Sequence, residues 1–165
     1  MTYCNFPNLK GCPKQLNVLN IQECNKLENL IGCPETIEKI NLLNLENFSS
    51  LEGCPSQLNS LNIKDCVNLK SLKYISPLIT GDFSVTFTGL VDLSNGPKEV
   101  GGNYYCNHNN KMKRLNAQDT VMTGHDCCFC CELAKRKRKA NRDMYIENVL
   151  KKELPKMNKS IKVIY

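Results

Sequence analysis

Residues 11–31 read GCPKQLNVLNIQECNKLENLI, residues 32–52 read GCPETIEKINLLNLENFSSLE, and residues 53–73 read GCPSQLNSLNIKDCVNLKSLK. The tripeptide Gly-Cys-Pro thus returns every 21 residues, and the apolar positions between its copies keep one register. Such self-similarity is typical of a solenoid, because a single unit cannot bury its apolar face without its neighbours. Six apolar columns align across the segments: Leu16, Ile37 and Leu58; Leu19, Ile40 and Leu61; Ile21, Leu42 and Ile63; Cys24, Leu45 and Cys66; Leu27, Phe48 and Leu69; and Leu30, Leu51 and Leu72.

Two further units continue the repeat with some drift. Pro77 and Pro97 follow their predecessors by 22 and 20 residues. We expect Asn109 to take the inward position after the fifth strand, where it can satisfy buried backbone groups. The remaining columns are filled by Ile79, Phe83, Val85 and Leu93 in the fourth unit and by Val100, Tyr104, Cys106 and Leu115 in the fifth.

The unit L-x-x-L-x-I-x-x-C-x-x-L-x-x-L-x-G-C-P resembles the leucine-rich-repeat pattern. The stretch GPKEVGGNYYCNHNN at 96–110 is similar to a short, divergent repeat type found in bacteriophage and other viral proteins. The resemblance covers residues 1–116. It implies a leucine-rich-repeat solenoid of about five coils, with short parallel β-strands and a mostly non-helical, extended or 3₁₀ convex side. It specifies an architecture and not an activity, because these repeats are generic scaffolds.

The strand face of such a solenoid is the expected site for a protein partner. Side chains that alternate with the core columns should point outward there. An Asn/Gln-rich face of this kind favours hydrogen-bonded recognition of protein or glycan, although it also suits a plain solvated scaffold. One row is Asn20, Asn41, Asn62, Ser84 and Tyr105, and the next is Gln22, Leu43, Lys64, Thr86 and Asn107.

The first coil has no amphipathic capping segment before it. Phe6 and Leu9 already occupy repeat columns. We therefore expect an exposed apolar edge. Such an edge would indicate a piece of a longer repeat protein, or self-association through this uncapped coil.

Eleven cysteines need an explanation other than secretory disulfides. Residues 1–10 lack the pattern of a signal peptide, and no apolar run is long enough to span a membrane, so a soluble cytoplasmic protein is expected. Thiols stay reduced in that compartment, which favours buried cysteines acting as small apolar side chains. Cys12, Cys33 and Cys54 would stack within disulfide reach, but the compartment argues against bridges and the column is too linear to surround one metal ion.

A cysteine-rich segment at 117–131 follows the repeats as a cap or junction. Two C-x-x-C pairs beside a histidine have the spacing that places thiolates on one metal, so one structural zinc is a candidate cofactor. The alternative is that no cofactor is bound and the segment simply covers the last coil. The candidate ligands are His125, Cys127, Cys128, Cys130 and Cys131.

Residues 132–165 form a basic tail. The first 110 residues carry 8 basic and 10 acidic side chains, whereas residues 111–165 carry 14 and 6, a net charge of +8. The absence of Pro and Gly from 132–153 predicts an α-helix that ends before Pro155. The basic patch could bind phosphates of nucleic acid without sequence preference, or serve only solubility. It consists of Lys135, Arg136, Lys137, Arg138, Lys139 and Arg142.

Catalysis is not expected. The only histidines are His108 and His125, and neither belongs to a convergent set of nucleophile, base and oxyanion donors. The leading hypothesis is a protein–protein interaction module, plausibly viral and acting in the host cytosol. The alternatives are a nucleic-acid-associated factor that uses the basic helix and a structural component of a virion that assembles through the first coil.

Overall fold

The computed structural model describes residues 5–112 and 121–122. All of them lie in the first of the two units into which the chain divides, Met1–Cys131 and Glu132–Tyr165. The expected helix over 132–153, the basic patch, the candidate zinc ligands and Leu115 lie outside the described residues.

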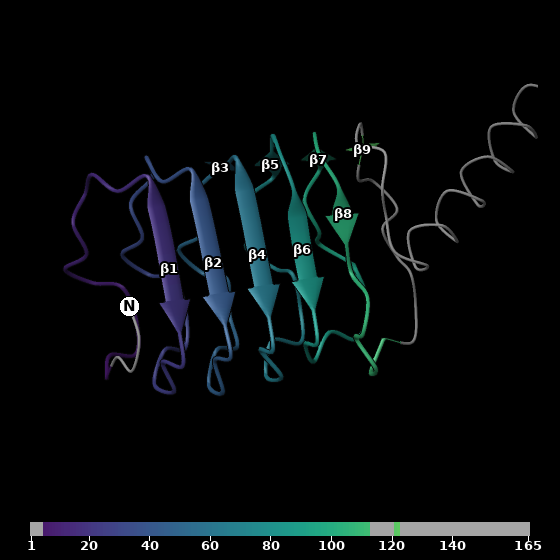
Figure 1. Ribbon diagram of the computed structural model, residues 1–165, viewed down its shortest axis with the longest axis horizontal. Coiled ribbons are helices and arrows are strands. Elements are labelled where there is room, and N and C mark those ends of the chain that lie inside the picture. The colour runs from purple at the N-terminus through teal and green to yellow at the C-terminus, as the bar shows by residue number, and fades with distance from the viewer. Residues whose placement is uncertain (1–4, 113–120, 123–165) are drawn as a thin grey trace, which may run out of the picture. The chain divides into compact units, whose positions relative to one another are not determined.

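The described chain is a parallel β-solenoid (Figure 1). Five strands stack side by side, and the four turns of chain between the first and the last are each close to one repeat long. The main sheet therefore confirms the period of the sequence. Its order is β1 (Val18–Gln22), β2 (Lys39–Leu43), β4 (Ser60–Lys64), β6 (Phe83–Thr86) and β8 (Tyr104–Tyr105).

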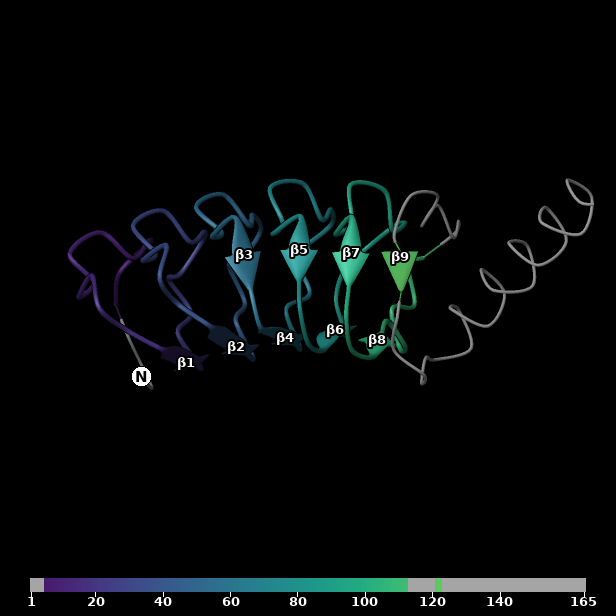
Figure 2. The same cartoon turned by 90° about the horizontal axis from the view of Figure 1, so that it is seen from above.

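A second parallel sheet runs along another side of the coils (Figure 2). Each of its strands has two residues, and no helix occurs among the residues that the structure describes, so this side is extended chain and turns. Val121 pairs with Glu99, which carries this sheet beyond residue 116, where the repeats were expected to end. Its order is β3 (Gln57–Leu58), β5 (Leu78–Ile79), β7 (Glu99–Val100) and β9 (Val121–Met122).

The core lies between the strand faces and the turns. In β1, Leu19 and Ile21 are buried while Val18, Asn20 and Gln22 are exposed, which is the alternation that the pleat of a strand produces. Parallel pairing then stacks each inward residue on its equivalent one coil later. The central apolar column is Leu19, Ile40, Leu61, Phe83 and Tyr104.

Asn109 closes the inward column that begins with Cys24, as expected. Its Oδ1 accepts hydrogen bonds from the backbone nitrogen and the hydroxyl of Thr88, at 2.8 and 2.6 Å. Its Nδ2 donates to the carbonyl oxygens of Val85 and Cys106, at 2.9 and 2.8 Å. The side chain is buried and links the last two described coils through four hydrogen bonds.

Two turn columns require a left-handed backbone. The glycine of each Gly-Cys-Pro has a φ near 90°, which only glycine adopts without strain. Tyr74 and Asn95 hold the same place in later coils, with φ of 70° and 57°. The second column follows the main sheet, and its φ angles lie between 52° and 58° at Glu23, Asn44, Asp65, Phe87 and His108.

The fourth coil departs from the expected register. Phe83 pairs with Leu61, so Asp82 is an extra residue before the strand, and the link to Leu90 is one residue shorter. The backbone nitrogen of Ile75 donates to the carbonyl oxygen of Leu72, three residues earlier. The cysteine of each Gly-Cys-Pro makes the same hydrogen bond in its own coil. The buried Ser76 therefore takes the place of the earlier prolines, and the assignment of Pro77 to that column was wrong.

The first coil is better covered than expected. Leu9 is only 3% exposed, and its backbone nitrogen donates to Ile31 of the next coil at 2.8 Å. Phe6, Cys12 and Leu16 are partly buried against the core. A pocket of about 190 Å³ lies among residues 6 and 8–13. In the described part of the chain, no helix is long and apolar enough to cross a membrane.

Candidate functional site

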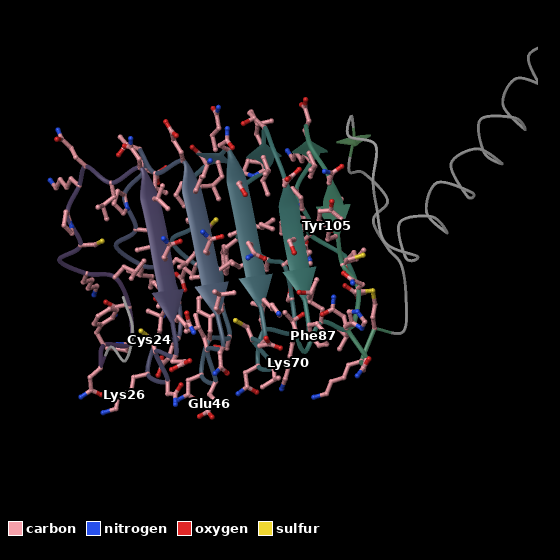
Figure 3. The ribbon with its side chains drawn as sticks, viewed as in Figure 1. Cys24, Lys26, Glu46, Lys70, Phe87 and Tyr105 are labelled. Carbon is pink, nitrogen blue, oxygen red and sulfur yellow. The ribbon has the colours of Figure 1, made fainter. Side chains whose placement is uncertain are left out.

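Both expected outer rows exist as aligned columns on the main sheet. The first joins Asn20, Asn41, Asn62, Ser84 and Tyr105 by strand pairing. The second joins Gln22, Leu43, Lys64 and Thr86, while Asn107 lies in the turn after β8. All of these side chains are exposed or half-buried, and Figure 3 shows Tyr105 at the last strand. We call these two rows the strand face.

Amides of neighbouring coils contact one another on this face. Nδ2 of Asn41 donates to Oδ1 of Asn20 at 2.6 Å. Similar links recur in the turns below the strands, where Asn47 and Asn68 donate from Nδ2 to the carbonyl oxygens of Asn25 and Glu46, each at 2.6 Å. The face therefore presents hydrogen-bonding groups at the spacing of the coils, which is roughly 4.8 Å.

An aromatic cluster lies at the end of the strand face. The rings of Phe87 and His108 stack with centroids 4.5 Å apart and planes 7° from parallel. Nζ of Lys64 lies 5.8 Å from the centre of the Phe87 ring, within the range of a cation–π contact. Phe87 is 42% exposed and has a left-handed φ of 54° (Figure 3).

Phe87 was not among the residues expected at the site. The available signal was an apolar side chain in the column that Asn44 and Asp65 occupy, where a turn favours polar residues. An exposed aromatic side chain on a strained backbone is a feature that concentrates at functional sites. We call Lys64, Phe87 and His108 the aromatic rim.

A shallow depression of about 630 Å³ runs beside the rim, across the ends of β1, β2 and β4. It is continuous with the second row of the strand face, and Glu46 lies in the turns below the strands in Figure 3. Its walls offer carboxylates, amides and two exposed or half-buried apolar side chains. The lining residues are Gln22, Glu23, Leu43, Asn44, Glu46, Lys64, Asp65 and Val67.

The described cysteines do not all behave alike. Cys12, Cys33 and Cys54 are half-buried and Cys66 and Cys106 are buried, and none of these five cysteines forms a disulfide. Cys24 is disulfide-bonded, which departs from the expectation that every cysteine acts as a small apolar side chain. Burial raises the pKa of Cys33 to about 12 and that of Cys54 to about 11.

Burial also raises the pKa of Cys66 from 9.0 to about 12, and its Sγ lies 3.5 Å from the carbonyl oxygen of Lys64. The protonated Cys66 thiol therefore contributes to the free energy of unfolding. This contribution is complete below the pKa of the thiol in the unfolded chain, near pH 9, and is lost as the pH rises toward 12. We predict that the stability difference between the wild type and Cys66→Ala shrinks by about 1–2 kcal/mol between about pH 8 and pH 10.5. Urea unfolding at both pH values measures it, and an unchanged difference would contradict the assignment.

The expected zinc cluster belongs to a part of the chain that the structure does not describe. His125 and the cysteines at 127, 128, 130 and 131 lie outside the described residues. Within the described ranges, no group of three or more His, Cys, Asp or Glu side chains is arranged to hold a metal ion.

Comparison of the chain with protein-family models, with curated proteins and with solved structures gives no significant match.

Proposed function

We propose that this chain is an interaction module that binds a protein partner through its strand face and aromatic rim. One observation carries the proposal: hydrogen-bonding side chains from successive coils stand in register on one side and end at Tyr105 and the Phe87–His108 stack. We further infer that the repeat is of the leucine-rich class. The inward Asn109 and the short parallel strands of the main sheet support this inference.

The chemistry of the face favours a polar partner with an anchoring side chain. Aromatic side chains are enriched in protein interfaces and anchor much of the binding energy, while surrounding polar groups set orientation and exclude water. Here Phe87 supplies the aromatic surface, and Lys64 adds a cation beside it. Asn20, Asn41 and Asn62 supply the polar surround.

The test is a comparison of two arginine substitutions in the full chain. Asn62 lies in the middle of the strand face on β4, whereas Gln57 is exposed on β3 in the other sheet. We expect Asn62→Arg to reduce capture of the partner at least tenfold, because a long cation blocks the centre of the face. Gln57→Arg carries the same charge change and should leave capture unchanged.

Quantitative cross-linking in the cells that produce the chain measures this capture. Equal loss in both variants, or equal retention, would reject the strand face as the binding surface. Phe87→Ala tests the rim separately, and we expect it to weaken binding without unfolding the coil.

A second candidate is association with nucleic acid through the basic patch at 135–139 and 142. The net charge of +8 over residues 111–165 favours it, because cations near phosphates release counterions. Charge reversal of Lys135–Lys139 should abolish such binding and spare the strand-face interaction. Retained nucleic-acid binding after charge reversal would reject this candidate.

A further inference from the structure

The thiols of Cys12, Cys33 and Cys54 sit in three copies of one turn. In each copy the cysteine follows a glycine with φ of 88–95°. Its backbone nitrogen donates to the carbonyl oxygen three residues earlier, at 2.8–3.0 Å. Identical backbone geometry gives the three side chains equivalent starting directions, and all three are half-buried against the edge of the core.

Neighbouring coils are in direct contact at these turns. The backbone nitrogen of Leu9 donates to Ile31 at 2.8 Å, and that of Leu30 donates to Glu52 at 2.9 Å. The paired strands of the same coils lie about 4.7–4.9 Å apart, and stacked coils carry a similar spacing into their turns. Cys12, Cys33 and Cys54 hold the same position in three successive hydrogen-bonded coils, so the middle thiol has one of the other two on each side.

This spacing fits an ion with two ligands opposite each other. A metal–sulfur bond is about 2.3 Å long, so two such bonds in line span about 4.6 Å, close to one coil spacing. A tetrahedral ion does not fit a straight column, whereas soft cations with two thiolate ligands do. From this match we propose that adjacent thiols of the Cys12–Cys33–Cys54 column bind a soft, two-coordinate monovalent cation of the Cu(I) class.

The column holds two such intervals, and Cys33 belongs to both. The cysteine column ends at Cys54, because Ile75 and Gly96 occupy the equivalent positions of the next two coils. Binding exchanges protons for the cation: two thiols and one M⁺ give an S–M–S unit with one net negative charge and two released protons. When both intervals are filled, Cys33 bridges two ions, and three thiols and two M⁺ give a unit with one net negative charge and three released protons. Burial and the Glu35 carboxylate both raise the pKa of Cys33 and Cys54, so the cation has to displace protons that these thiols hold more tightly than usual. This site is independent of the proposed strand-face function.

Silver(I) is the probe, because it is soft and closed-shell and does not cycle between redox states. The full, reduced chain is treated with Ag(I), pulsed with N-ethylmaleimide and digested with trypsin. Cleavage places each thiol on its own peptide, residues 11–14, 27–39 and 40–64, and the reference Cys66 on 65–70. We expect Ag(I) to slow alkylation of the three column thiols at least tenfold more than that of Cys66.

Cysteine variants identify the pairing. Cys33→Ser should abolish protection of both Cys12 and Cys54, since these are two coils apart. Cys12→Ser should keep the protection of Cys33 and Cys54, and the double variant Cys12→Ser/Cys54→Ser should remove that of Cys33. Far-ultraviolet circular dichroism checks that each variant folds. If Cys33→Ser does not fold, the double variant replaces it as the test of pairing.

Three outcomes overturn the proposal. The first is protection of Cys12 that survives Cys33→Ser, which indicates single-thiol binding. The second is equal protection of Cys66 and the column. The third is a disulfide that joins peptide 27–39 to peptide 11–14 or 40–64 in the chain as purified, before reductant is added, because the thiols are then unable to act as ligands.

Discussion

Replacing Gly53 with alanine is expected to lower the free energy of unfolding by about 3–5 kcal/mol. The residue has a φ of +88°, and a Cβ there would lie 2.4 Å from the carbonyl oxygen of Leu30 in the preceding coil. The coils cannot separate to make room, because Leu30 donates its backbone nitrogen to Glu52 at 2.9 Å, one residue away. The substitution therefore adds a steric clash to the cost of the left-handed backbone. Urea unfolding followed by circular dichroism measures the loss.

Gly11→Ala is the matched control. Gly11 has nearly the same φ, +89°, but a Cβ there would meet nothing within 4 Å among the described residues, since Gly11 belongs to the first coil. Only the backbone strain remains, and we expect a loss of about 1–2 kcal/mol. Equal effects of the two substitutions would mean that contact between coils contributes nothing at Gly53.

Asn109→Ala should destabilise the chain by about 3–5 kcal/mol. The side chain makes four hydrogen bonds in a buried position, two accepted from Thr88 and one donated to each of Val85 and Cys106. Alanine removes every one of them and leaves buried backbone groups without this partner, which costs more than the bonds themselves contribute. The midpoint and slope of urea unfolding give the change.

Two further substitutions separate hydrogen bonding from side-chain volume. Asn110 is exposed, so Asn110→Ala should change stability by less than about 0.5 kcal/mol. Asn109→Asp keeps the size but removes both donated bonds and places a carboxylate in a buried site, so it should be at least as harmful as alanine at neutral pH. A mild effect of Asn109→Asp would show that the side chain fills space and does not hold the coils together.

The period, the core and the outward rows follow from the amino-acid sequence alone. A repeat of 21 residues forces equivalent residues to stack, so the aligned columns predicted that Leu42 is buried and that Asn41 faces outward. The same logic placed Asn109 inside, because an inward position after a strand needs a group that can satisfy backbone polar atoms. These predictions depend only on spacing, and the structure confirms the positions.

The places where the regular spacing fails, and the side chains that meet across coils, become visible only in the folded chain. The insertion at Asp82 and the shorter link before Leu90 compensate for each other, so the core columns return to register. Before that insertion, Ser76 already stands in the proline column. The stack of Phe87 on His108 depends on a left-handed backbone in two successive coils, which a residue pattern does not report. The same holds for the thiols of Cys12, Cys33 and Cys54. The sequence aligns them, and the folded chain gives all three one common turn and joins their coils by hydrogen bonds.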